Sequence, residues 1–141
     1  MIKGFEDVVP DLTEYEIKNI IPVVVQGLRT KRGKSNAITN KEMIKGLTRN
    51  KILTERGKPL SEATMRKIIN YIRVNDLIER LVASSEGYWI EPIDDNVRVY
   101  IESLQQRENE IRRVREALMR QVGDLPKRKT IEQIKQESIF N

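Results

Sequence analysis

Apolar residues recur at helical spacing in three segments of the first half of the chain, and each segment follows the same start signal. Thr13, Thr39 and Ser61 are the kind of residue that caps a helix N-terminus by accepting a backbone hydrogen bond. Glu16 and Glu42 stand three residues after the two threonines and complete a capping box in each case. We therefore predict helices that start near residues 14, 40 and 62.

The apolar stripes behind these caps must cover one another to be buried. They consist of Ile17, Ile20, Ile21, Val24, Val25 and Leu28, then Met43, Ile44 and Leu47, then Met65, Ile68, Ile69 and Ile72. Pro22 lies inside the first stripe and cannot donate to the carbonyl of Lys18, so we expect a kink in one helix rather than two helices. The third helix should stop at Asn75–Asp76, because asparagine tolerates the left-handed conformation that closes a helix.

Beyond the third stripe the pattern changes from helical to extended. Residues 80–91 read as a β-hairpin around the turn signal Glu86-Gly87, and residues 36–38 are expected to add a short third strand. At least one of Tyr88 and Trp89 is expected in the core. The predicted fold class is mainly α with a small β-hairpin (α+β).

A long helix is predicted from Asp94 or Asp95, as the N-cap, to about residue 122. Its apolar positions follow a heptad, interrupted by Arg107, Glu108 and Arg115. The residues expected to make a dimer seam are Val97, Ile101, Leu104, Ile111, Val114 and Leu118. Two interpretations stay open: the helix pairs with a second copy as a coiled coil, which we favour, or it packs on its own domain.

The composition removes most catalytic chemistry. The 141 residues contain neither cysteine nor histidine, which excludes disulfides, thiolate nucleophiles, imidazole bases and the usual zinc ligands. We expect no enzyme activity, no cofactor and no metal, although a metal site built from carboxylates alone stays open. No secretion signal or membrane-spanning segment is evident, so a cytoplasmic protein without membrane contact is expected.

The positive charge is concentrated in one block. The chain carries a net charge of +5, but residues 29–80 hold fourteen Lys and Arg against five Asp and Glu, a net of +9. Residues 1–28 have a net of −3 and residues 81–141 a net of −1. Such a block attracts a phosphate backbone, and the alternative is an ordinary solvated surface.

The third predicted helix displays a polar face opposite its isoleucines. Arg66, Lys67, Asn70 and Arg73 lie there, and arginine and asparagine are the side chains that pair with guanine and adenine in a major groove. A solvated helix face is the alternative. A predicted backbone clamp consists of Arg29, Lys31, Arg32 and Lys34, where Gly33 would let backbone amides approach a phosphate. Lys41 and Lys45, and then Arg49, Lys51, Arg56 and Lys58, would extend this surface.

The segment LSEATMRKIINYIRVNDLIERLVASSEGYWI, residues 60–90, resembles the recognition helix and wing of the winged helix-turn-helix family. The similarity is greatest to small winged-helix proteins of phages and prophages, and it covers residues 12–93. It implies a DNA-binding fold in which the third helix enters the major groove. The connection over residues 48–59 is longer than the turn of a compact helix-turn-helix, and the hairpin tip lacks the Arg or Lys that commonly enters a minor groove.

These observations predict a winged-helix domain over residues 12–93, a long helix over 94–122 that forms a homodimer, and a basic tail with a short helix over 123–141. The leading hypothesis is sequence-specific or structure-guided binding of double-stranded DNA, in a phage-type transcriptional regulator or replication accessory factor. The alternative is an adaptor that uses the winged helix as a scaffold and docks a protein on its long helix. The tail is a candidate site for a protein partner.

Overall fold

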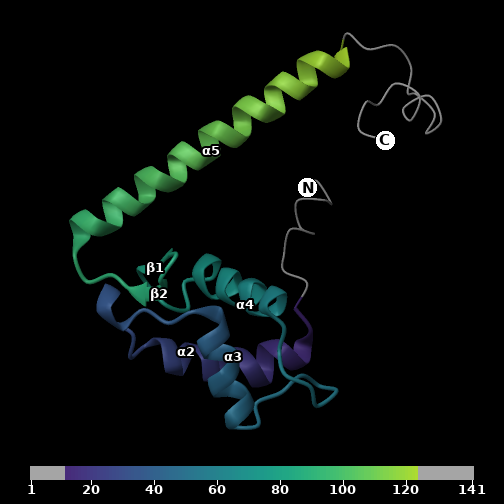
Figure 1. Cartoon of the computed structure of the whole chain (residues 1–141), viewed down its shortest axis with the longest axis vertical. Helices are drawn as coiled ribbons and strands as arrows, with labels where there is room; N and C mark the ends of the chain where they lie inside the picture. The colour runs from purple at the N-terminus through teal and green to yellow at the C-terminus, as the bar shows by residue number, and fades with distance from the viewer. Residues whose placement is uncertain (1–11, 124–141) are drawn as a thin grey trace, which may run out of the picture. The chain divides into compact units, whose positions relative to one another are not determined.

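The computed structural model describes residues 12–123, which are mainly helical with one antiparallel hairpin and a long C-terminal helix (Figure 1). The α+β class expected from the sequence is confirmed at this level. The chain divides between Tyr100 and Ile101 into two compact units, here called the N-terminal and C-terminal units. The predicted basic tail, apart from Gly123, lies outside the described residues.

The first helix runs without interruption from residue 14 to residue 28, but its geometry changes along the way. A π-helical segment, η1 (Glu16–Ile20), leads directly into α2 (Ile21–Leu28). The Ile21 amide donates to the carbonyl of Glu16, five residues earlier. Because Pro22 has no amide hydrogen, a π-turn just before it is the type of irregularity expected where a helix accommodates proline. One helix rather than two was the correct prediction.

The next two helices begin at the predicted caps. In α3 (Asn40–Arg49), the Glu42 amide donates to Thr39 Oγ1 at 3.1 Å, and the Thr39 amide donates to Glu42 Oε1 at 3.0 Å. In α4 (Glu62–Val74), the Thr64 amide donates to Ser61 Oγ at 3.1 Å. Thr13 and Glu16 form the same reciprocal box at the first helix. All three predicted helix starts are confirmed.

The end of α4 differs in one detail from the prediction. Asn75 has an ordinary φ of −97°, and it is Asp76, with φ of 55°, that adopts the left-handed conformation. Aspartate tolerates this conformation for the same reason as asparagine, since its short polar side chain can bond locally. The helix therefore stops where expected, with the closing residue displaced by one.

The predicted hairpin is present as β1 (Leu81–Ser84) and β2 (Gly87–Ile90), paired antiparallel with Ser84 opposite Gly87. The expected third strand is reduced to a single bridge, in which Ile38 exchanges hydrogen bonds with Tyr88 at 2.8 and 3.0 Å. A Cβ atom on Gly87 would lie 2.4 Å from the Ile38 carbonyl oxygen, and Gly87 has φ of 119°. Glycine is required here for both reasons.

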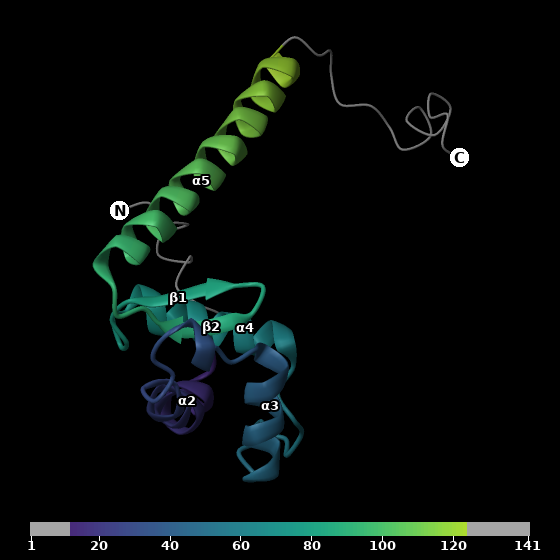
Figure 2. The ribbon, with the colours of Figure 1, turned by 60° about the vertical axis from the view of Figure 1, so that its left-hand side comes forward.

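The core of the N-terminal unit is built from residues of the first helix, α3, α4 and the hairpin. Figures 1 and 2 show how these elements are arranged. α4 packs against both α2 and α3. Its Met65, Ile68 and Ile72 are completely buried, and Leu28 of α2 is 2% exposed. Trp89 is also buried, which confirms the core role expected for one of the two aromatic residues.

The long helix α5 spans Asp94–Gly123, and its start is formed differently from the prediction. Neither Asp94 nor Asp95 precedes the helix, because both lie in its first turn. Just before the helix, Glu91 Oε2 accepts from the Ile93 amide at 3.0 Å and from Asn96 Nδ2 at 3.3 Å, which holds the chain at the helix start. Asp94 instead forms an ion pair with Arg80 at 2.5 Å.

Within residues 12–123, no helix combines the length and the apolar character that crossing a membrane would require.

Candidate nucleic-acid interface

The outer face of α4 carries most of the predicted reading residues. Arg66, Lys67 and Asn70 are exposed, while the opposite face of the same helix is buried in the core. Glu62 is the acid of α4 and lies in its first turn, where negative charge favours the helix. From Arg66 onward, the exposed face therefore offers cationic and amide groups without an intervening carboxylate.

Arg73 departs from the predicted arrangement. It is half-buried, and its Nη2 donates to the Tyr100 hydroxyl at 2.6 Å while the guanidinium carbon lies 5.5 Å from the centre of the Tyr100 ring. Hydrogen bonding and cation–π attraction both hold it there. Arg73 thus links α4 to the first turns of α5 inside the N-terminal unit, and the other three predicted side chains are exposed.

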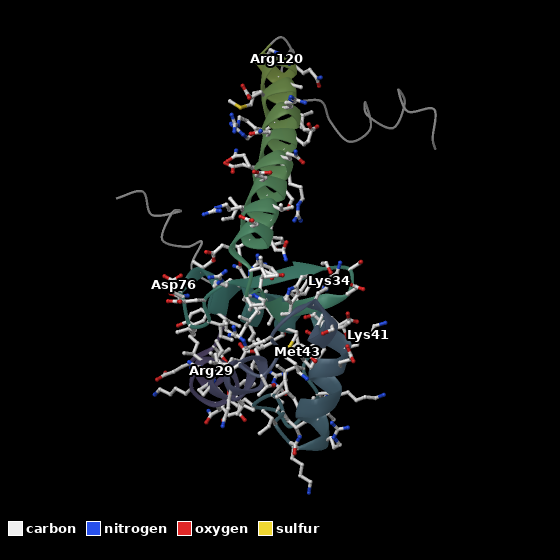
Figure 3. The ribbon with its side chains drawn as sticks, turned by 90° about the vertical axis from the view of Figure 1, so that its left-hand side faces the viewer. Arg29, Lys34, Lys41, Met43, Asp76 and Arg120 are labelled. Atoms are coloured by element: carbon white, nitrogen blue, oxygen red, sulfur yellow. The ribbon has the colours of Figure 1, made fainter. Side chains whose placement is uncertain are left out.

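The predicted clamp does not form one cluster. Figure 3 shows Lys34 and Lys41 on one side of the N-terminal unit and Arg29 on the other. Lys34 Nζ lies 3.3 Å from the Glu86 carboxylate at the hairpin turn, and both side chains are well exposed. A hollow of about 310 Å³ brings Lys41 together with Glu62 of α4 and with the hairpin turn. Lys34 and Lys41 therefore both lie near the hairpin turn, and Arg29 lies away from them.

Part of the backbone of the clamp segment is already paired with β2. The Gly33 amide donates to the Ile90 carbonyl at 2.9 Å, and the Lys31 carbonyl accepts from the Ile90 amide at 2.7 Å. The amide of Gly33 itself therefore already has an acceptor within the chain, while the expectation that this glycine lets backbone amides of the segment approach a phosphate stays a prediction. Lys31 is half-buried and lines a second hollow, of about 580 Å³, between α2 and α3, whereas the Arg32 side chain is exposed.

A row of cations follows α3. Lys41, Lys45 and Arg49 are all exposed, and they stand four residues apart, so they lie along one face of the helix. Lys41 is in the first turn, close to the hairpin turn, and Arg49 is at the other end. This row extends the positive surface away from Lys34.

The long connection between α3 and α4 is ordered by its own contacts. The Thr54 amide donates to the Lys58 carbonyl at 2.8 Å, and the Thr54 hydroxyl accepts from the Lys58 amide at 3.1 Å. Leu60 is buried and fixes the return to α4. Arg56 and Lys58 are exposed in the small loop that these bonds close, so the extra residues present two further cations.

A buried carboxylate at the hairpin exit was not predicted as a structural centre. Glu91 is 6% exposed, and its Oε1 accepts from Trp89 Nε1 at 3.0 Å. The pKa of Glu91 lies below its ordinary value. The hydrogen bond from Trp89 is the largest cause, and the hydrogen bond from the Ile93 amide is the second. The sequence signal would have been a tryptophan two residues before a glutamate at a strand end, a spacing that carries no general rule.

The chain matches no protein-family model, and neither a curated protein nor a solved structure matches it. Over the described part of the chain, no three acidic side chains gather in a way that would hold a metal ion.

Proposed function

We propose that the N-terminal unit is a winged helix-turn-helix domain that binds duplex DNA, with α4 as the recognition helix. One observation carries the proposal. α4 buries its isoleucines completely and turns Arg66, Lys67 and Asn70 outward as a set. A helix fixed from behind with such a face has the side chains that read base edges in a major groove.

The order of elements supports the same proposal. The first helix, the single bridge at Ile38, α3, α4 and the hairpin follow one another in the order of a winged helix. α3 and α4 would form the helix-turn-helix pair, and β1 and β2 the wing. The loop between α3 and α4 is long for a helix-turn-helix, but the two helices still pack against each other.

The roles of the side chains follow from their chemistry. Arg66 would donate two hydrogen bonds to a guanine, and Asn70 would pair with an adenine. Lys34, Lys41 and Lys45 would meet phosphates on the flanking strand, which adds affinity but no sequence preference. The hairpin turn carries Glu86, which opposes entry into a minor groove, so the backbone contact in this region would come from Lys34, which lies beside the turn.

Fluorescence anisotropy of the full chain with labelled duplexes, selected from a random pool, tests the proposal. If about five phosphates are neutralised, log K should fall against log salt with a slope of about −4.5. Arg66→Ala or Asn70→Ala should each cost roughly 1 to 3 kcal/mol on the selected site and relax the base preference. Lys41→Gln should weaken binding to all sequences alike.

Two matched variants serve as controls. Lys18→Gln removes an exposed helical lysine outside the basic block, where it pairs with Glu14, and compares with Lys67→Gln. Arg98→Ala removes an exposed helical arginine that pairs with Asp95 and compares with Arg66→Ala. The proposal would be contradicted if test and control variants changed the affinity for DNA equally, or if the full chain did not bind duplex DNA at low salt. Either result would favour the adaptor hypothesis.

A further inference from the structure

We infer that α5 pairs with α5 of a second copy of this chain and that the two helices run antiparallel. The inference goes beyond DNA binding and does not depend on it, because it uses only the side chains of α5. Three observations support it: an exposed apolar strip, the symmetric spacing of that strip, and the distribution of charge along the helix.

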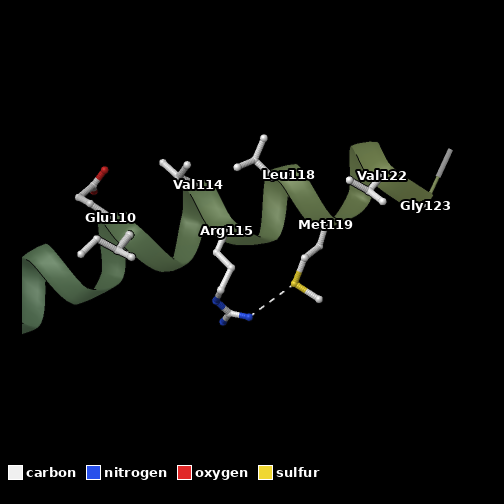
Figure 4. Close-up of a pocket in the computed structure, with 8 residues that line it drawn as sticks. Glu110, Val114, Arg115, Leu118, Met119, Val122 and Gly123 are labelled. Atoms are coloured by element: carbon white, nitrogen blue, oxygen red, sulfur yellow. Dashed lines mark hydrogen bonds between the residues drawn. The ribbon is translucent and has the colours of Figure 1, made fainter. Parts of the chain in front are cut away.

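Most large apolar residues of α5 are exposed to an unusual degree, whereas Val97 is half-buried. Ile111 is 69% exposed, Val114 60% and Leu118 54%, and none of the described residues of the helix is buried. Figure 4 shows Val114 and Leu118 projecting from the same side of the ribbon. Contiguous apolar surface on a charged helix marks an interaction site, because covering it removes the unfavourable contact with water.

The strip has a symmetry that suits a copy of itself running in the opposite direction. At 100° per residue, the six predicted seam residues fall within about 140° of one another. Their spacing reads the same from either end. About a two-fold axis between Arg107 and Glu108, the positions at equal heights would be Val97 with Leu118, Ile101 with Val114, and Leu104 with Ile111.

The centre of the strip distinguishes the two orientations. Arg107 and Glu108 interrupt the apolar positions and lie on the same face. In a parallel pair, Arg107 would meet the same arginine of the other copy, which is unfavourable where water is excluded. In the antiparallel pair, the arginine of each copy lies level with Glu108 of the other, so opposite charges meet at the axis.

The charge along α5 favours the same orientation. Residues 94–110 carry five acids and two arginines, a net of −3, whereas residues 111–123 carry four arginines and one acid, a net of +3. The helix dipole acts only within the first and last turns. It does not explain Glu108, Glu110, Arg112 and Arg113 in the middle. Antiparallel pairing sets each acidic half beside a basic half, and parallel pairing sets like beside like.

The orientation determines how far apart the two helix starts lie. With the axis at residue 107.5 and a rise of 1.5 Å per residue, the two copies of residue 94 would lie about 40 Å apart along the bundle. The N-terminal units would therefore be attached at opposite ends of the helix pair.

Distance measurements between two copies test the orientation in the full chain. The chain has no cysteine, so one introduced cysteine carries one spin label per copy. Gln106→Cys and Ala117→Cys place labels on the side away from the strip. Antiparallel pairing predicts separations along the axis of about 5 Å for residue 106 and about 28 Å for residue 117. Equal separations at the two positions, or a chain that sediments as a monomer, would overturn the inference.

A matched pair of substitutions tests the strip itself. Ile111→Arg should convert the dimer to a monomer in sedimentation experiments, because it places a charge in the middle of the seam. Val99→Arg should leave the dimer intact, since Val99 is similarly exposed, at 64%, but projects about 130° from the centre of the strip. If both variants stay dimeric, the strip is not the interface. Neither residue lies on α4, so dimer formation and DNA binding by these variants are two independent measurements. Failure of one proposal is thereby distinguished from failure of the other.

Discussion

The two amphipathic helices α4 and α5 use their apolar faces in opposite ways. α4 buries Ile68 and Ile72 completely within the chain, so the face that it leaves outside is mainly polar, with Val74 exposed at its last position. α5 leaves Ile111 and Leu118 exposed, and its charged side chains surround an open apolar strip. Amphipathic pattern alone thus does not say which face acts. The face that the chain itself does not cover is the one available for binding.

The sharpest test of this contrast uses the same substitution in both helices. Ile68→Ala should lower the free energy of unfolding by about 2 to 5 kcal/mol, because it removes buried methyl groups and leaves a cavity. Ile111→Ala should change it by less than about 0.5 kcal/mol in dilute solution, because the residue is 69% exposed. Urea titration measures both. Similar losses in dilute solution would mean that α5 is covered within its own chain.

A second contrast lies between two glycines. Gly87→Ala should destabilise the N-terminal unit by about 2 kcal/mol or more, since the new Cβ meets the Ile38 carbonyl and the φ is positive. Gly27→Ala in α2 meets open space and should stabilise the unit by roughly 0.5 to 1 kcal/mol. Thermal unfolding followed by circular dichroism compares them. A neutral Gly87→Ala would indicate that the hairpin does not pack on Ile38.

The hairpin exit gives a third test, through pH. Glu91→Gln should cost about 1 to 3 kcal/mol at neutral pH, because a buried carboxylate that accepts three hydrogen bonds loses its charge. The folded pKa of Glu91 is lowered, so its contribution is fully present above the unfolded pKa, about 4.3, and is lost as pH falls through the folded value.

The difference in stability between wild type and Glu91→Gln should therefore shrink as the solution is acidified below pH of about 4.3. The single tryptophan donates to Glu91, so its fluorescence reports unfolding at the site concerned. Glu14→Gln removes an exposed carboxylate that pairs with Lys18 and serves as the control, with little change expected at any pH. A pH-independent difference would contradict an ionised Glu91 in the fold.

The local elements were predictable because their signals are local. Capping boxes, helical stripes and the hairpin turn each involve residues within a few positions of one another, and each formed as expected. The features that escaped prediction join distant segments or depend on burial. Arg73 with Tyr100, Gly33 with Ile90, and Lys34 with Glu86 all pair across long stretches of chain.

The candidate site was predictable to the same extent. The outward set on α4 was predicted from helical periodicity alone and consisted of Arg66, Lys67, Asn70 and Arg73. The first three are exposed, and Arg73 is half-buried against Tyr100. The clamp was assigned from charge density, which does not indicate direction. Its members accordingly separate in the fold, with Lys34 near the hairpin turn and Arg29 on the other side (Figure 3).

The smallest expected effect concerns the outer surface of the N-terminal unit. Glu86 is the acid that faces Lys34, so Glu86→Gln would free a cation beside the proposed DNA path. An exposed pair of this kind is worth roughly 0.2 to 1 kcal/mol, so affinity for duplex DNA should rise by about 1.4- to 5-fold. The effect should fade as salt screens the surface. Glu116→Gln, which changes the net charge equally on α5, should raise the affinity less. If the two substitutions act alike, the gain comes from net charge alone, and Lys34 does not lie on the path.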